Sequence, residues 1–294
     1  MSFEKIATDT VVWLLRQWMR LPVPFLLSLG RGLGRIIYWL PNKRKHVAKV
    51  NIGLCFPEMQ AEDSKQLLKA NMIATGQGLI EQMMSLWCHH DRFVQHVSFS
   101  GLEHIQTDEN GRAPILLTCH TTSIQFGVRC LNTRLNKPGH MLMRQDNNKV
   151  LEAHLTAARE RYAEKVIDKK DMRTLLRSLA QGNPVYYAPD QNFSYNFEYI
   201  PFFGVDAATT VALAKLAHVK NIAVVPWFCF RTGTNTWHVE VLPRAEFFGA
   251  ADYRQVLLDM HALFEQHIKK YPEQYLWVHR RFKTHPQGKN YLYK

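Results

Sequence analysis

The sequence has few cysteines, and their arrangement cannot build a disulfide framework. Five cysteines are scattered along 294 residues, their number is odd, and no CxxC pair occurs. Small disulfide-stapled domains need an even, closely spaced set of cysteines, so this class is excluded. The pattern indicates a chain that works in a reducing compartment.

The sequence also lacks a hydrophobic run that would cross a bilayer easily. Residues 10–40 are strongly apolar and contain three tryptophans, but four arginines interrupt them and Pro22 and Pro24 divide them. A span needs about 20 predominantly apolar residues, and a signal peptide would need a basic start and a cleavage site. Short apolar helices with Arg and Trp suit a segment lying in the membrane interface. The alternatives are a helix pair packed on the body of the protein and a true transmembrane span.

Acidic residues are too few to balance the basic ones. The chain has 25 Asp and Glu against 37 Lys and Arg, which gives a formal net charge of +12. This charge favours anionic partners such as phosphorylated substrates, an acidic carrier protein or an acidic membrane surface. No nucleic-acid recognition motif is present, so we expect no nucleic-acid partner. We expect residues 1–46 to form a membrane-associated helical segment, whose basic end suits an anionic cytoplasmic leaflet, and residues 47–294 to form one domain.

Short apolar runs alternate with helical patterns through the middle of the chain. Strands are predicted at 97–100, 115–118, 141–143, 166–167 and 185–187, with helices between most of them. This order predicts an α/β fold with a largely parallel or mixed sheet flanked by helices. Further on, we expect a turn at 200–204, a helix over 209–219, strands at 223–229 and 238–242, and a helix over 253–270.

The stretch ILLTCHTTSIQFG, residues 115–127, combines a buried strand with a polar turn. His120 follows the strand directly, and Gln125 falls within the first two turns of the next helix, so their side chains can approach each other. One of the three hydroxyl residues at 121–123 is expected to cap that helix. Cys119 ends an apolar strand, so it is interpreted as a small buried hydrophobe rather than a nucleophile. Taken alone, His120 could equally be a structural cap.

Other polar residues stand where strands end. Arg144 and Asp190 each follow a predicted strand, and the carboxyl ends of parallel strands are where such folds place their sites. His89, His90 and Asp91 have the side chains of metal ligands, but adjacent histidines are expected to project in different directions. We interpret this trio as a solvated helix end, and expect neither a metal nor a nucleotide cofactor.

Several longer motifs resemble the late acyltransferases of lipid A biosynthesis, the lauroyl/myristoyl transferase family of Gram-negative bacteria. They are NIGLCFPEM at 51–59, GLEHI at 101–105, His120 with its four-residue spacer, YYAPDQN at 186–192 and PEQYLWVHRRFKT at 272–284. The resemblance covers nearly the whole chain. It implies a glycerol-phosphate acyltransferase-like fold and an enzyme at the cytoplasmic face of the inner membrane.

The resemblance also implies site residues and partners. His120 would be the general base, Arg144 and Arg159 would bind anionic substrate or the oxyanion, and Asp190 would orient a basic group. Alternatively, Asp190 is a turn residue that bonds its own backbone, and each of the two arginines is a solvated side chain. The donor would be acyl-acyl carrier protein, and the acceptor a Kdo-bearing lipid A precursor, a phosphorylated glycolipid.

The sequence departs from the family pattern at one position. The family has Glu or Asp after the histidine and four spacer residues, whereas this chain has Gln125. A glutamine cannot stabilise an imidazolium by charge. Either the chain is an inactivated Glu-to-Gln form, or it is a natural variant that is slow or uses another carboxylate such as Asp190. An alternative function is therefore a catalytically impaired lipid-binding or scaffold protein of the same fold at the membrane.

Overall fold

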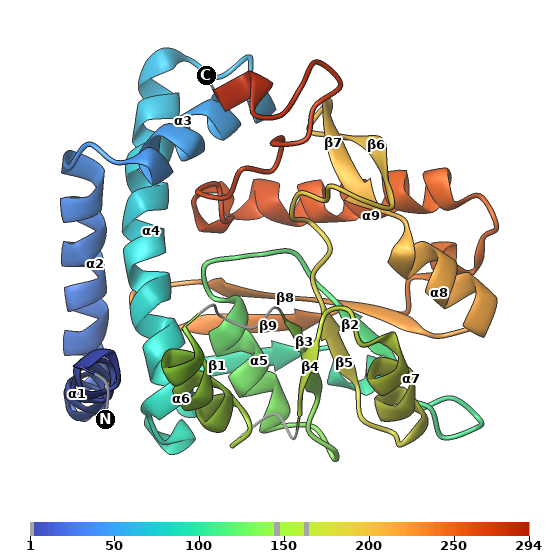
Figure 1. Ribbon diagram of the computed structural model, residues 1–294, viewed down its shortest axis with the longest axis horizontal. Coiled ribbons are helices and arrows are strands. Elements are labelled where there is room, and N and C mark those ends of the chain that lie inside the picture. Colours follow the sequence, from blue (N-terminus) through green and yellow to red (C-terminus); the bar gives the residue numbers. More distant parts are fainter. Residues whose placement is uncertain (1–2, 144–147, 162–164, 294) are drawn as a thin grey trace.

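A computed structural model describes residues 3–143, 148–161 and 165–293. Its helices and strands alternate through the middle of the chain, after four successive helices (Figure 1). The helices are α1 Phe3–Trp18, α2 Val23–Trp39, α3 Lys43–Cys55, α4 Ala61–Trp87, α5 Ile124–Asn132, α6 Lys149–Arg159, α7 Met172–Ala180, α8 Ala212–Lys220 and α9 Tyr253–Lys270. The strands are β1 Val97–Ser100, β2 Ile115–Leu117, β3 His140–Met143, β4 Val166–Asp168, β5 Val185–Tyr187, β6 Phe197–Phe202, β7 Val205–Thr210, β8 Val224–Arg231 and β9 Trp237–Val241.

A seven-stranded sheet forms the centre of the fold, with the order β1-β9-β8-β2-β5-β3-β4. The five strands from β8 to β4 are all parallel. β9 is antiparallel to β8, and β1 is parallel to β9. The predicted α/β architecture with a largely parallel sheet flanked by helices is therefore confirmed.

Both faces of the sheet are buried, which explains the continuous apolar runs of its central strands. Ile115 and Leu117 face a core shared with α7, α8 and α9, whereas Leu116 between them faces a second core shared with α2, α4 and α5. All three side chains of β2 are completely buried. The central strands thus hold the loops at their carboxyl ends on a rigid base.

Residues 197–210 form a hairpin that differs from the sequence prediction. β6 and β7 pair antiparallel around Phe203 and Gly204, whose φ values of 51° and 77° are left-handed. The turn expected at 200–204 is thus confined to two residues, and α8 begins at Ala212 rather than at 209. Thr209 and Thr210, which the sequence prediction placed in the helix, belong to β7 instead, because they pair with the aromatic strand β6.

The N-terminal helix α2 packs closely along α4, as Figure 1 shows. A Cβ atom at Gly34 would lie 2.4 Å from the Cα of Ile73, and one at Gly76 would lie 2.4 Å from the backbone nitrogen of Gly34. Only glycine permits this approach of two backbones. Gly30 and Gly34 both lie at this helix contact, whereas Gly32 has open space around its Cβ position.

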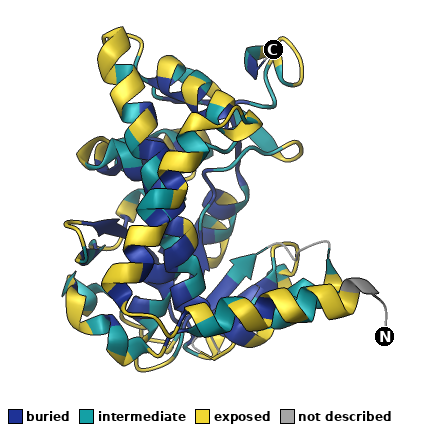
Figure 2. Cartoon of the chain, turned by 90° about the vertical axis from the view of Figure 1, so that its left-hand side faces the viewer, coloured by how far each residue is buried: buried dark blue, intermediate teal, exposed yellow. Residues whose placement is uncertain are grey.

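The outer sides of α1 and α2 carry exposed large hydrophobic side chains. Trp13, Trp18, Phe25, Ile36 and Trp39 are between 50% and 75% exposed. Figure 2 shows this side of the molecule, with exposed residues running along α1 and up the neighbouring helices. In the described part of the chain, no helix is both long and apolar enough to cross a membrane.

Candidate functional site

The adjacent strands β2 and β5 bring His120 and Asp190 together. Leu117 and Tyr187 are paired in register at the ends of the two strands, and each site residue lies three positions further along. The Nδ1 of His120 is 2.6 Å from Oδ1 of Asp190, and the backbone N–H of His120 donates to Oδ2 at 3.0 Å. Asp190 is buried, whereas the His120 side chain remains 25% exposed. The carboxylate therefore fixes the ring while one side of it stays accessible.

The two side chains shift each other's proton affinity. Burial alone would lower the pKa of His120, but the charge of Asp190 and the hydrogen bond to it outweigh burial, so this pKa is raised above 6.5. Burial would raise the pKa of Asp190, but the charge of His120 and several hydrogen bonds lower it well below 3.8. Asp190 is thus an ionised partner that holds Nδ1, which leaves Nε2 of His120 to take a proton from a bound hydroxyl group.

Gln125 is not the hydrogen-bond partner of His120. It lies in the first turn of α5, as the sequence predicted, but its Oε1 is buried and has no hydrogen-bond partner among the described residues. The Nδ1 of His120 already contacts Asp190. The carboxylate beside the imidazole is therefore Asp190, which follows β5. The natural-variant interpretation of Gln125 named Asp190 as such a carboxylate.

A buried ion pair supports the turn that carries His120. Ser123 occupies the N-cap position of α5, directly before the helix, but its hydroxyl makes no capping hydrogen bond and instead donates to Glu81 at 2.7 Å. Arg231 at the end of β8 contacts Glu81 at 2.7 Å and donates to the Thr122 hydroxyl at 2.7 Å. The expected cap is thus wrong, because the hydroxyls of the turn satisfy a buried charge pair instead.

A C-terminal segment pairs with the same turn. We call residues 273–281 the strap. The backbone N–H of Leu276 donates to the His120 carbonyl at 2.9 Å, and that of Thr122 donates to the Gln274 carbonyl at 2.7 Å. The Tyr275 hydroxyl donates to Oδ2 of Asp190 at 2.9 Å. Although the strap follows Asp190 by some eighty residues, it completes the surroundings of both site residues.

Of the two predicted arginines, Arg159 is described by the structure, and it is not joined to this pair of residues. Arg159 is buried at the end of α6, where its Nη1 lies 3.6 Å from Glu152 Oε1. No hydrogen bond or ion pair among the described residues links Arg159 to His120 or Asp190. The solvated-surface alternative for Arg159 is wrong, and its substrate role stays a prediction. Arg144 lies outside the described residues.

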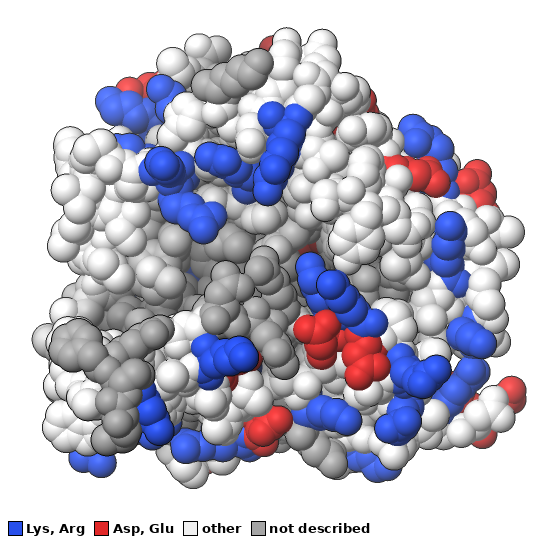
Figure 3. Space-filling model, in the orientation of Figure 1, with Lys and Arg blue, Asp and Glu red and all other residues white. Residues whose placement is uncertain are grey.

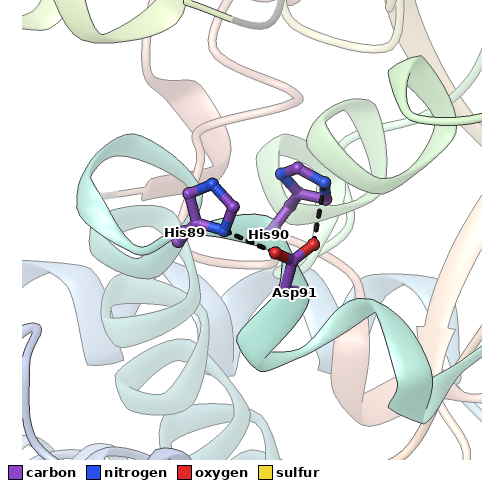
Figure 4. Close-up of side chains that lie close together, drawn as sticks. All are labelled: His89, His90 and Asp91. Atoms are coloured by element: carbon purple, nitrogen blue, oxygen red, sulfur yellow. Dashed lines mark ion pairs between the residues drawn. The ribbon is translucent and has the colours of Figure 1, made fainter.

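His89, His90 and Asp91 form the one group in the described ranges whose ligand atoms lie close enough to share a metal ion. The expectation that the two histidines diverge is wrong, because their rings stack with centroids 4.7 Å apart. Nδ1 of His89 lies 3.0 Å from Oδ2 of Asp91, and Nε2 of His90 lies 3.0 Å from Oδ1 (Figure 4). The side chains of His89 and Asp91 are 68% and 70% exposed, which agrees with the solvated helix end that the sequence predicted.

Cys119 is unsuited to nucleophilic chemistry despite its place next to His120. It is completely buried, and burial, followed by the charge of Asp190, raises the pKa of its thiol well above 9.0. Because the thiolate is the reactive form, this cysteine acts as a small core residue. The sequence interpretation of Cys119 is confirmed.

Sequence reasoning missed Glu81, Arg231, Gln274 and Tyr275. Glu81 could have been noticed as a lone acid within an apolar helical pattern, and Arg231 as a charge closing an apolar strand. Gln274 and Tyr275 lie in the motif at 272–284 that carries the family resemblance. Nothing in that motif reveals which backbone or carboxylate groups its side chains contact.

Known proteins similar to this chain share one activity class. A family model described as bacterial lipid A biosynthesis acyltransferase matches residues 4–284. The chain is 30% identical to the lipid A biosynthesis lauroyltransferase of Escherichia coli K12, over 95% of this chain and 90% of that protein. It is 29% identical to the palmitoleoyltransferase of the same strain, over 96% and 92% of the two chains. It is 28% identical to the myristoyltransferase of that strain, over 92% and 84%.

Proposed function

Because the chain belongs to the bacterial lipid A biosynthesis acyltransferase family, we propose that it transfers a fatty acyl chain from acyl-acyl carrier protein to a hydroxyl of a Kdo-bearing lipid A precursor. The observation that carries this proposal is the pair of His120 and Asp190 at the carboxyl end of a parallel sheet, in which the His120 side chain remains 25% exposed. General-base catalysis of acyl transfer needs such a positioned imidazole.

The reaction uses His120 as base and then as acid. Nε2 takes the proton of the acceptor hydroxyl as its oxygen attacks the thioester carbonyl, and the carbon–sulfur bond then breaks. The imidazolium returns the proton to the departing thiolate of the carrier protein. Asp190 stays ionised and stabilises the imidazolium between the two steps, as the acid of a serine-protease triad does. No enzyme nucleophile is required, which agrees with the inert thiol of Cys119.

Lys and Arg side chains around a hollow on one face of the molecule support the proposal that both substrates are anionic. Figure 3 shows a hollow in this face of the molecule, with Lys and Arg gathered above it over α3 and the C-terminal segment. The two elements touch, because Arg44 of α3 donates to the Val278 carbonyl in the strap at 3.2 Å. Phosphate groups of a glycolipid and the acidic surface of a carrier protein both favour such a basic surface.

The exposed hydrophobic side chains of α1 and α2 support a place at the cytoplasmic face of the inner membrane. Tryptophans together with arginines on short helices suit the headgroup region of a bilayer. We infer that these helices lie in the interface, so that the acceptor lipid reaches the site from the bilayer. Close packing of α2 on α4 gives these helices a second role as part of the protein body.

The test is transfer by the purified full-length chain in phospholipid micelles, with acyl-acyl carrier protein and a Kdo-bearing lipid A precursor. Mass spectrometry should show a product heavier by one acyl group, and the His120→Ala variant should lose it. The exposed His96 provides a matched control, and His96→Ala should retain full activity. Binding of the precursor without any transfer would instead support the catalytically impaired lipid-binding alternative.

A further inference from the structure

Two buried asparagines hold the strap through alternate backbone carbonyls. Asn71 of α4 donates from its amide nitrogen to the carbonyls of Glu273 and Tyr275, both at 2.8 Å. Asn51 of α3 likewise donates from its amide nitrogen to the carbonyls of Trp277 and His279, at 2.6 and 2.8 Å. Buried amide groups seldom forgo such bonds, so each asparagine fixes the strap in one register.

This register delivers one hydroxyl group to the site. Tyr275 is 4% exposed, and its hydroxyl donates to Oδ2 of Asp190, the oxygen that also accepts the backbone N–H of His120. Oδ1 of the same carboxylate accepts the imidazole Nδ1. Asp190 therefore divides its charge among three donors, one of which comes from the strap and not from the pair itself.

From this geometry we propose that Tyr275 is a positioning residue, held in place by the strap, which aims Asp190 at His120 and limits how strongly the imidazole holds a proton. The proposal rests on the proposed function, in which His120 is the base. A carboxylate that loses a donor becomes more basic and attracts the imidazolium more strongly. A base that holds its proton too firmly is protonated over more of the working pH range.

The Tyr275→Phe change removes the hydroxyl group and leaves the ring in its place. We expect the pKa of His120 to rise by roughly half a unit or more, because the remaining charge of Asp190 falls on the imidazole. The acid limb of the pH profile of kcat/KM should move to higher pH by the same amount. A purely structural role of Tyr275 would lower the rate at all pH values and leave this limb where it was.

The Tyr293→Phe variant is the matched control. The Tyr293 hydroxyl is also buried, just beyond the end of the strap, where it accepts the Phe282 backbone N–H at 3.1 Å and donates to Asn51 at 2.6 Å. The Tyr293→Phe change therefore removes two buried hydrogen bonds, compared with the one bond to Asp190 that Tyr275→Phe removes, and neither of the two involves Asp190. We expect Tyr293→Phe to lose stability but to keep the pKa of His120.

The titration can be measured without turnover. Diethyl pyrocarbonate acylates neutral imidazole, so the pH dependence of His120 modification, followed by peptide mass spectrometry on the full-length chain, gives its pKa directly. An unshifted midpoint in Tyr275→Phe, or an equal shift in Tyr293→Phe, would overturn the proposal. Because this readout needs no substrate, an inactive parent protein would refute the proposed function and leave this test intact.

An Asn71→Leu variant tests the strap itself. Leucine keeps the volume of the side chain but removes both bonds to the strap, so Tyr275 loses its fixed position. We expect lower stability together with an upward shift of the His120 midpoint in the same direction as for Tyr275→Phe. Loss of stability with no shift would show that Tyr275 reaches Asp190 without the asparagine clamp, and would overturn this part of the proposal.

Discussion

Replacing Asp190 by asparagine is the sharpest test of the paired residues. Oδ2 of Asp190 accepts the His120 backbone N–H, which can only donate, and the Tyr275 hydroxyl, while Oδ1 accepts the imidazole. An amide has a single oxygen, which we expect to stay with the two donors at Oδ2. Its NH₂ group then faces Nδ1 of the imidazole.

This substitution should leave the imidazole in the wrong tautomer. An NH₂ group facing Nδ1 places the ring proton on Nε2, the nitrogen that must accept the substrate proton. The same exchange in a serine-protease triad costs about four orders of magnitude in kcat. We expect a loss of roughly 10³- to 10⁴-fold, or about 4 to 5.5 kcal/mol of transition-state stabilisation at 1.36 kcal/mol per tenfold change.

The assay is turnover of acyl-acyl carrier protein with the lipid A precursor for the parent, Asp190→Asn, His120→Ala and the double variant. Because the carboxylate acts through the imidazole, the double variant should be no slower than His120→Ala alone. Full activity in Asp190→Asn would refute the pairing as the source of catalysis.

Gln125→Glu separates the two explanations of the departure from the family pattern. If Gln125 occupied the orienting position of an inactivated enzyme, restoring the acid should raise the rate roughly 100-fold or more. Since Asp190 already holds Nδ1, we expect a change of less than about tenfold. A large gain that requires His120 would contradict the assignment of Asp190 as the orienting carboxylate.

Three further outcomes are expected. In denaturant unfolding, Gly34→Val should destabilise the protein by about 1 to 3 kcal/mol, because the new side chain would clash where two backbones touch. Gly32→Ala has open space at its Cβ position and should stabilise the protein by up to about 1 kcal/mol. Equal effects of the two changes would contradict the α2–α4 contact. Glu81→Gln should cost about 3 to 5 kcal/mol, because its buried guanidinium partner loses its counter-charge, while Glu62→Gln on the surface should cost under about 0.5 kcal/mol. Removing residues 1–40 should shift the chain out of the membrane fraction, and unchanged fractionation would argue against the interfacial helices.

The pH dependence of activity follows from the raised pKa of His120. The base must be neutral, so kcat/KM should fall as the pH drops through a value above 6.5. The same pair stabilises the fold. The His120 contribution is complete below the unfolded pKa and is lost as the pH rises through the raised pKa, while the Asp190 contribution is present above 3.8 and is lost in acid.

The sequence allowed the sheet and the two strand-end residues to be predicted, because apolar runs and the polar groups that follow them are local patterns. The pairing of His120 with Asp190 needs the strand order, in which β5 lies next to β2 although β3 and β4 come between them in the chain. Helical spacing alone placed Gln125 near His120. Spacing does not reveal which group contacts Nδ1 of His120. In the structure that group is Asp190, which lies 70 positions further along the chain.

The supporting contacts were beyond prediction for a different reason. Glu81 and Arg231 are 150 residues apart and come from a helix and a strand that each look complete without them. The strap has no regular periodicity, and the asparagines that fix it bind backbone carbonyls, which every residue carries. Side chains that recognise backbone leave no complementary pattern in the sequence of their partner.

Several separate parts of the protein contact the middle of α4, and these contacts fix its length as well as its side chains. Asn71 donates a hydrogen bond to the strap, and Gly76 contacts α2. A Cβ atom at Gly78 would lie 2.5 Å from the Thr122 carbonyl oxygen. Glu81 accepts a hydrogen bond from Ser123, in the turn that follows His120. One residue inserted between Gly76 and Gly78 would rotate everything beyond it by about 100° and advance it by about 1.5 Å. The strap and the α2 contact would stay in place while Glu81 swung away from its partner. We therefore expect insertions and deletions to be absent from this stretch of the helix in any functioning version of the enzyme, even where single substitutions are tolerated.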